Sequence, residues 1–554
     1  MLDRPTVMTR PGPALPLTPP DWPHCSYGTI PEDPVGCRGI HVPGYTACLA
    51  HLTDIDRSAY LASLGPGSDI DHRGTAFTEP LLDALLDALR DPATGHPCLG
   101  SVQFNKATFQ GAAHFNSVTF QGAAQFESAA FQDAAEFDAV NFQDAARFAS
   151  ATFHDAWFDS AVFSGDVEFA GATSANRAWF RNAQFETAAW VSFTCGGLVL
   201  LDGAVFHQPV ILSFVARRVS CGRTRWAATA SLHLMYAELH LTDAVFEYPV
   251  LVTGSLGPYR GEAVLPEGLV GQTPGVSLAN VDGADVAHLA LHNVDLSGCE
   301  FAGAVHLDQL KVDGWCTFAT TPSGWGRRFP WRWSKRNTLA EEHYWRVRTT
   351  HHSARAVSRG WSAPPQHTPE LQPAAVAALY RQLRKSLEDG KNEPDAADFY
   401  YGECEMRRHD TTRPWGERTL LTAYWALSGY GLRATRAMGW LVASMAVTIM
   451  VMVLWGLPAN DTKPQTTGRQ VGVGQEFKLT TGTPAPRNPA GPLSERVSTE
   501  RFEKALRLVI NSVVFRSSGQ DLTTVGTYTE MVSRLAEPIL LGLAVLAVRG
   551  RVKR

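Results

Sequence analysis

The sequence lacks the short motifs that mark the common nucleotide-binding and hydrolytic enzymes. Among its 554 residues there is no phosphate-binding P-loop, no Gly-x-Ser-x-Gly nucleophile turn and no dinucleotide fingerprint after a strand. Gly472-Val473-Gly474 stands outside any βαβ pattern. The absence of these motifs argues against the enzyme classes that depend on them, and we expect a protein without catalytic activity.

Charge is absent from Met438 to Leu457, and all nine cysteines lie at or before Cys404. An uncharged apolar run of about 20 residues is long enough to cross a bilayer as a helix. Arg433 and Arg436 precede this run, which predicts a cytoplasmic N-terminal part. The lack of cysteine in the predicted outer loop agrees, because no disulfide is needed there. The Pro-rich N-terminus has no apolar core, so we expect no signal peptide.

A second apolar stretch, Leu535 to Val548, is shorter and contains Glu537 and Pro538. Its length also suits a re-entrant or buried helix. The basic residues that follow favour a cytoplasmic exit; they are Arg549, Arg551, Lys553 and Arg554. We therefore predict spans at about 438–457 and 531–549, in a multi-pass protein of the cell membrane with the N-terminal bulk and the C-terminus both cytoplasmic.

A phenylalanine recurs every five or six residues from Phe104 to Phe169, and Ala or Val stands two positions before nearly every one. The series is Phe104, Phe109, Phe115, Phe120, Phe126, Phe131, Phe137, Phe142, Phe148, Phe153, Phe158, Phe163 and Phe169. This period fits neither a helix nor a single strand. It requires a backbone that turns once per unit and points the same two positions inward each time, which is a stacked solenoid.

Units such as Ala151-Thr152-Phe153-His154-Asp155 and Ala161-Val162-Phe163-Ser164-Gly165 resemble the bacterial pentapeptide-repeat family. The resemblance implies a mainly β solenoid, a right-handed quadrilateral parallel β-helix with four five-residue sides to a coil. Here the steps alternate between five and six residues, and we expect the extra residue to bulge at alternate corners. The phenylalanines would then face the axis and form a ladder along the core.

The five-residue spacing fades after Phe185 and returns near the end of this region, at Val281, Val286, Leu291, Leu296 and Phe301. The Arg-rich segment between, with Arg217, Arg218, Arg223 and Arg225, reads as degenerate coils with insertions. We predict a β-helix over 98–320, with about ten coils and a length of about 50 Å.

The remaining chain divides by composition. We predict a disordered Pro-rich tail at 1–21, a Cys/His-containing capping region at 22–97, a basic aromatic connector at 321–374, a helical hairpin at 375–416 and a membrane domain at 417–554. The connector's Arg and Trp residues suit anionic lipid headgroups. Nucleic acid is the weaker alternative, because no recognised fold accompanies the charge. The hairpin, similar to one tetratricopeptide unit, is either a packing strut or a partner-binding module.

The capping region contains Cys25, Cys37, Cys48 and His51, in the pattern C-x11-C-x10-C-x2-H. Three thiolates and one imidazole suit a tetrahedral structural zinc, although only the Cys48/His51 pair has a short zinc-like spacing. Ordinary unliganded cysteines are the alternative. After Thr78, leucines at helical spacing predict a helix that covers the open first coil; they are Leu81, Leu82, Leu85, Leu86 and Leu89.

The membrane domain has a Pro-, Gly- and Thr-rich outer loop at 458–500 and an amphipathic helix at 502–515 that lies on or dips into the membrane. Thr523, Thr524, Val525 and Gly526 follow. This order resembles the two-span pore domain of potassium channels, and implies a strip whose carbonyls coordinate an ion. Tyr528 stands where that family has its second glycine, so a degenerate two-span anchor is the alternative.

Three functions fit these features. The first is a membrane-anchored scaffold whose cytosolic β-helix binds a protein partner. The second is a two-span ion channel, a homo-oligomer with the β-helix as its cytoplasmic regulatory domain. The third follows from the family resemblance: an acidic surface from Glu127 to Glu168 would imitate DNA and inhibit a topoisomerase.

Overall fold

The computed structural model describes residues 18–255, 265–322, 335–350, 353–366, 368–459, 464–468, 479–482, 485–513 and 521–552. Several predictions lie outside these residues: most of the Pro-rich tail, Gly472-Val473-Gly474, the Arg/Trp-rich part of the connector at 323–334, parts of the outer loop, and the end of the amphipathic helix. The chain forms two compact units. Unit 1 is Met1–Leu371 with Ala378–Ala396, and unit 2 is Gln372–Ala377 with Ala397–Arg554.

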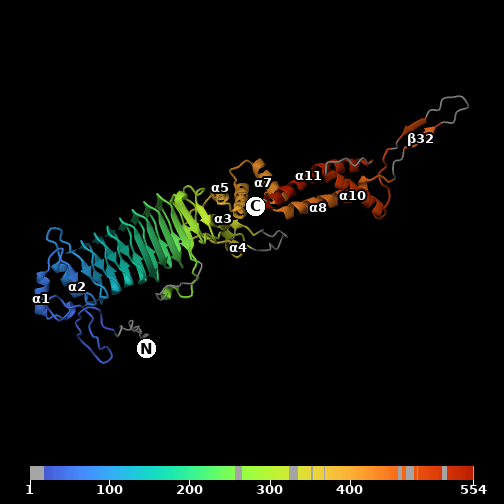
Figure 1. The fold of residues 1–554 in the computed structure, drawn as a ribbon. Helices are drawn as coiled ribbons and strands as arrows, with labels where there is room; N and C mark the ends of the chain where they lie inside the picture. Colours follow the sequence, from blue (N-terminus) through green and yellow to red (C-terminus); the bar gives the residue numbers. More distant parts are fainter. Residues whose placement is uncertain are drawn as a thin grey trace, which may run out of the picture. The chain divides into compact units, whose positions relative to one another are not determined.

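Unit 1 is a parallel β-solenoid of about ten turns, as the repeat predicts, and its strands stack coil upon coil (Figure 1). One side is an eight-stranded sheet of β3 (Cys98–Leu99), β7 (Thr119–Phe120), β10 (Asn141–Phe142), β13 (Val162–Phe163), β16 (Gln184–Phe185), β19 (Val205–Phe206), β22 (Arg225–Trp226) and β25 (Val245–Phe246).

The other sides form a continuous 21-stranded sheet. Its strands are β1 (Ile70–Asp71), β2 (Ala76–Phe77), β4 (Val102–Gln103), β5 (Thr108–Phe109), β6 (Ala113–His114), β8 (Ala124–Gln125), β9 (Ala130–Glu136), β11 (Ala146–Arg147), β12 (Thr152–Trp157), β14 (Val167–Glu168), β15 (Ala172–Trp179), β17 (Ala189–Cys195), β18 (Leu198–Leu200), β20 (Val210–Val215), β21 (Arg218–Ser220), β23 (Ala230–Met235), β24 (Glu238–His240), β26 (Val250–Gly254), β27 (Ser277–Asn280), β28 (Leu289–His292) and β29 (Lys311–Asp313).

The phenylalanines fill the axis of the solenoid, as predicted. Equivalent rings in successive coils stack face to face: Phe137 lies 4.8 Å from both Phe115 and Phe158, with its ring within 5° of parallel to each. Neighbours within a coil meet edge to face, such as Phe126 and Phe137 at 5.6 Å. These rings are buried, so the repeat is core and not a binding surface.

Alternate corners of the early coils contain a left-handed residue. In the first of these turns the N–H of Ala107 donates to the Phe104 carbonyl, and Lys106 has a φ of 57°. The same conformation recurs at Ser117, Ser128, Ala139, Ser150, Ser160 and Asn182. The six-residue step behaves as predicted. The step from Phe131 to Phe137 has six residues and the step from Phe153 to Phe158 has five, and the pairing of β12 with β9 shifts register between Phe153 and Asp155, which marks an extra residue bulging from β9.

The prediction of degenerate coils after Phe185 is wrong for the segment up to Gly254. Coils continue there without interruption, with Val210, Ala230 and Val250 paired in register 20 residues apart. The insertion lies between β26 and β27 and includes a 3₁₀ turn, η2 (Glu267–Leu269). The phenylalanine rhythm fades because leucine, valine and tryptophan replace phenylalanine at the same inward positions.

The solenoid also begins before residue 98, since β1 pairs with β4 in the next coil. Helix α2 (Glu79–Ala88) interrupts this first coil between β2 and β3 and buries Leu81, Leu82, Leu85 and Leu86. It lies against β6, to which no strand of the first coil is paired among the described residues. The predicted helix therefore covers part of the open end, but as an insertion within the first coil.

A buried ion cluster closes the other end of unit 1. It joins β31 (Asn337–Thr338), which pairs with β30 (Ala319–Thr320), to α3 (Ala340–Thr349) and α5 (Pro373–Asp389). The Arg336 guanidinium donates two bonds of 2.6 and 2.7 Å to the Glu342 carboxylate, which also accepts from Tyr380. Burial opposes ionisation, but Arg336 and Arg346 outweigh it and lower the pKa of Glu342 to about 2. These two connector arginines face inward, which contradicts a lipid-binding role for them.

The other helices of the chain are α1 (Asp54–Ser63), α4 (Ser353–Val357), α6 (Glu393–His409), α7 (Trp415–Ser428), α8 (Ala434–Val451), the π-helical turn η4 (Met452–Gly456), α9 (Leu493–Arg496), α10 (Thr499–Val513) and α11 (Thr524–Val552). Short 3₁₀ turns are η1 (Leu49–His51) and η3 (Val286–His288). In the predicted outer loop, β32 (Gln465–Gly468) and β33 (Leu479–Gly482) form an antiparallel hairpin. Two helical segments, Ala434–Gly456 and Thr524–Arg549, are long and apolar enough to cross a membrane.

Candidate metal site and membrane domain

The structure brings Cys25, Cys37, Cys48 and His51 together. Their ligand atoms all lie within 4.8 Å of one another. The Cys37 and Cys48 sulfurs are 3.7 Å apart, and the Cys25 and Cys48 sulfurs lie 3.5 and 3.3 Å from His51 Nδ1. A tetrahedral zinc with bonds of about 2.3 Å to sulfur and about 2.0 Å to nitrogen places its ligand atoms about 3.5–3.8 Å apart. The four side chains therefore fit a zinc ion.

Two local structures position these ligands. Cys25 and Cys37 lie on antiparallel segments: the Cys25 N–H donates to the Gly39 carbonyl and the Cys37 N–H to the Tyr27 carbonyl, both at 2.9 Å. Cys48 precedes η1 as its N-cap and His51 ends it, and the His51 N–H donates to the Cys48 carbonyl. The antiparallel pairing replaces the short Cys-x-x-Cys turn of common zinc motifs, which explains the long spacing in the sequence.

Surrounding groups support the cluster. A side chain on Gly39 would place its Cβ 2.7 Å from the Cys48 Cβ, so only glycine fits beside that ligand. The Gly39 N–H also donates to the Cys37 sulfur at 3.4 Å. The Tyr27 ring stacks on the His51 imidazole at 4.2 Å. A hydrogen bond from the Cys48 thiol lowers the pKa of Cys37 to about 5, while that bond and burial raise the pKa of Cys48.

The metal cluster is hydrogen-bonded to the first coil of the solenoid. The Ile40 N–H, beside the cluster, donates to the carbonyl of Arg73 in the first coil at 2.9 Å. The Trp22 indole donates to the Arg38 carbonyl, and the Arg73 guanidinium lies over its ring. A metal ion in this cluster would order the segment that covers the N-terminal end of the β-helix.

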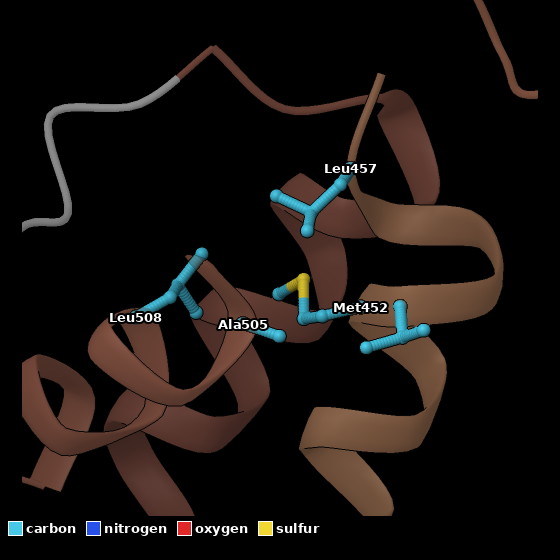
Figure 2. Close-up of a cluster of buried hydrophobic side chains, with 5 residues drawn as sticks. Met452, Leu457, Ala505 and Leu508 are labelled. Carbon is cyan, nitrogen blue, oxygen red and sulfur yellow. The ribbon is translucent and has the colours of Figure 1, made fainter. Parts of the chain in front are cut away.

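In unit 2, the amphipathic helix α10 packs against both candidate spans. Leu508 and Ala505 of α10 point toward Met452 and Leu457 at the end of the first span (Figure 2). Arg501 donates hydrogen bonds to the carbonyls of Val453, Leu457 and Pro458 at 2.9–3.1 Å. This arginine satisfies carbonyls that a helix end leaves without partners. The apolar face of α10 is therefore turned toward the helix pair, and Arg501 holds the start of α10 against the end of the first span.

The structure does not support the predicted ion-coordinating strip. Thr524, Val525 and Gly526 form the first turn of α11, and Thr523 precedes it as a cap whose hydroxyl accepts from the Gly526 N–H. A filter requires an extended backbone whose carbonyls face an ion. Here the Val525 carbonyl accepts a bond from the Thr529 hydroxyl instead. The resemblance to a potassium-channel pore therefore has no support in this segment.

Gly526 has another role, the close contact between α11 and η4. A Cβ on Gly526 would lie 2.3 Å from the Gly456 carbonyl oxygen, and one on Gly456 would lie 3.1 Å from the Gly526 Cα. We expect Gly526→Ala to lower the stability of the membrane domain by about 1–3 kcal/mol through overpacking, measured as a lower melting temperature in detergent. Gly542→Ala is the matched control, because Gly542 lies in the same helix with open space around it. Equal melting temperatures for the two variants would contradict the contact.

The aromatic side chains before the first span mostly face inward. The Trp425 indole donates to the Tyr401 hydroxyl at 3.0 Å, and the buried Tyr430 donates to Glu405 at 3.0 Å. The Arg408 and Arg436 guanidiniums lie 4.7 and 5.2 Å from the centre of the Trp425 ring system. These side chains form a core beside the first span. The most exposed aromatic nearby is Trp415 at the start of α7, which is 82% exposed.

One side of the solenoid has an uncharged face, formed by the outward side chains of β17, β20, β23 and β26. Its central column is Trp190, Ile211, Ser231 and Leu251, paired in register in successive coils. The same column carries charge beyond each end of this face. Glu168 pairs with Trp190 in the preceding coil, and Lys311 pairs with Ala290, the residue that follows Leu251 in the column. The four strands contain no Asp, Glu, Lys or Arg. Trp190 and Ile211 are 65% and 48% exposed, an unusual exposure for apolar side chains in adjacent coils.

The acidic residues from Glu127 to Glu168 do not form one face. Glu127 and Glu168 lie near each other beside one phenylalanine column, whereas Asp138 and Asp159 lie beside another. Asp159 is also paired with Arg181. These four acidic residues are therefore divided between two columns rather than gathered along one.

Comparison with known proteins identifies the repeat. Residues 104–152 and 148–194 match a family model described as pentapeptide repeats (9 copies). The match covers the coils with regular phenylalanines, and the later coils lie outside it. No curated protein and no solved structure matches the chain.

Proposed function

We propose that this chain, whose solenoid is built from pentapeptide repeats, is a membrane-anchored scaffold that binds a protein partner through its uncharged face. Trp190 and Ile211, adjacent and exposed in this column, carry the proposal together with Leu251 beyond Ser231, because exposed apolar surface on a folded domain marks an interaction site. The absence of formal charge favours a partner with an apolar, uncharged surface over nucleic acid or anionic lipid, which bind basic patches.

The two long apolar helices support membrane anchoring, with the solenoid and the C-terminus on the cytoplasmic side. Arg433, directly before the first helix, and Arg436, in its first turn, agree with this orientation. A channel function has no specific observation in its favour, because the strip proposed to coordinate ions is helical. The zinc cluster would serve the scaffold by holding the first coil closed.

Membrane anchoring is tested by fractionation. We expect the full chain to remain in the membrane pellet after alkaline carbonate extraction, and a chain that ends before residue 417 to appear in the soluble fraction. The physical reason is that helices of this length and apolarity are held by the bilayer core. Release of the full chain by carbonate would contradict the proposed anchor.

Partner binding is tested with a photo-crosslinking residue at Ser213, in the middle of the uncharged face. We expect specific adducts that Ile211→Asp abolishes, because burying an unpaired charge at an interface costs several kcal/mol. Val245→Asp is the matched control: Val245 is as exposed as Ile211 but lies on the other sheet. Adducts that respond equally to both substitutions would contradict binding at this face.

A further inference from the structure

A carboxyl group lies inside the membrane domain, among three helices. Glu537 of α11 is fully buried and stands 13 residues from Thr524 and 12 from Arg549, the ends of the second candidate span. The Thr448 hydroxyl of α8 lies 3.0 Å from its Oε1, and Ser512 of α10 lies beside the carboxyl. An ionisable side chain at this depth is uncommon and usually serves a function.

No positive charge faces this carboxyl among the described residues. The first span has no charged side chain from Met438 to Gly456, so α8 contributes only Thr448. From α10 the facing polar group is Ser512, and from α11 Arg534 lies one turn away without forming an ion pair with Glu537. The second carboxyl oxygen, Oε2, has no hydrogen-bond partner. An ionised carboxylate without a cation in such surroundings is strongly disfavoured.

Each surrounding hydroxyl has one proton, so it can donate either to a neighbouring carbonyl or hydroxyl or to the Glu537 carboxyl. Thr448 lies 3.0 Å from the Ser444 carbonyl, and Ser533 lies 3.0 Å from the Glu530 carbonyl. Ser512 and Ser533 are 2.8 Å apart. When Thr448 and Ser533 donate to these helix carbonyls, Ser512 donates to Ser533, and each hydroxyl proton is used. In this arrangement no hydroxyl proton is left for the carboxyl, which favours its neutral acid form; the single proton of that acid can be donated to one of these hydroxyl oxygens.

We propose that Glu537 is a proton-binding site in the membrane interior, occupied when α10 is packed against α8 and α11. The inference rests on the proposed membrane insertion. Loss of the proton would turn the hydroxyls of Thr448 and Ser512 toward the carboxylate, at the expense of their bonds to Ser444 and Ser533. The packing of α10 is thereby coupled to the protonation of one carboxyl.

The test is infrared spectroscopy of the full chain in phosphatidylcholine nanodiscs at neutral pH. We expect the C=O stretch of a protonated carboxyl in the unaltered chain, its loss in Glu537→Gln, and its retention in Glu503→Gln. Glu503 is the matched control because it lies on the exposed face of α10. In Thr448→Val the band should persist at higher frequency, since the carboxyl loses a hydrogen-bonding partner; this variant keeps the test valid if Glu537→Gln fails to fold.

Two results would overturn the proposal. One is the absence of any protonated-carboxyl band in the unaltered chain at neutral pH. The other is a band that appears only when sodium is removed, which would mean that a metal cation occupies the site in place of a proton. Carbonate extraction of the cell membranes that contain the chain separates these results from a failure of membrane anchoring, since a chain released by carbonate contradicts the anchor whatever its spectrum.

Discussion

Replacing Cys48 with serine is expected to abolish zinc binding by the purified protein. Cys48 is fully buried and its sulfur lies nearest to both the Cys37 sulfur and His51 Nδ1, so its loss leaves an incomplete ligand set. Structural zinc sites contribute about 10–16 kcal/mol to folding in small peptides, so this is the largest single effect expected in the chain. Elemental analysis should find one zinc per chain before the substitution and none after it.

Limited proteolysis supplies the second measurement. We expect rapid cleavage before the first coil in Cys48→Ser, because the segment around Ile40 is bonded to that coil only when it is ordered. Cys316→Ser is the matched control, a half-buried cysteine outside the cluster. Acidification should also release the metal, because thiolates and imidazole bind zinc only when deprotonated; stability present at neutral pH is lost as the pH falls. A zinc-free unaltered protein would contradict the site.

Replacing Phe137 with alanine is expected to destabilise the early coils by about 3–5 kcal/mol. Its ring is fully buried and stacks on both Phe115 and Phe158, so the substitution leaves a cavity between three coils. Because each coil contacts only its neighbours, the loss should be local. Hydrogen exchange should show reduced protection in the coils of Phe115, Phe137 and Phe158, with little change near Phe246.

Tyr248→Ala is the control for this substitution. It also removes an aromatic ring from a coil, but Tyr248 is 51% exposed at a corner. We expect a change within about 0.5 kcal/mol, as for most surface substitutions. Equal losses of protection in the two variants would contradict the assignment of the phenylalanine column to the core.

The fold could be predicted from the sequence where the core chemistry repeats at a fixed interval. The phenylalanines of the early coils and Val281, Val286 and Leu291 of the late coils are all buried, as their spacing indicates. The middle coils could not be predicted from phenylalanine spacing, because inward positions such as Leu212 and Leu232 keep the register but not the residue type. Coils built from other apolar residues do not show in the phenylalanine spacing.

The candidate sites could be predicted only in part. The four zinc ligands are recognisable by residue type, yet their proximity depends on the antiparallel pairing around Cys25 and Cys37. The Thr-Thr-Val-Gly strip suggested a pore, but its glycine is needed for the close approach of Gly456. Residue type points to the zinc ligands and to Gly526, but neighbours that are distant in sequence determine the role of each.

The sequence by itself determined the solenoid, the inward position of its phenylalanines and the two long apolar helices. Each of these follows from a pattern in which neighbouring residues satisfy a local period, so the chain need not be folded for the pattern to be visible. The tertiary structure alone decided the contact of Gly526 with Gly456, the uncharged face of the solenoid and the hydroxyl partners of Glu537. The physical reason is that these features join groups from separate coils or helices, and the pairing depends on turns and packing that no local period encodes.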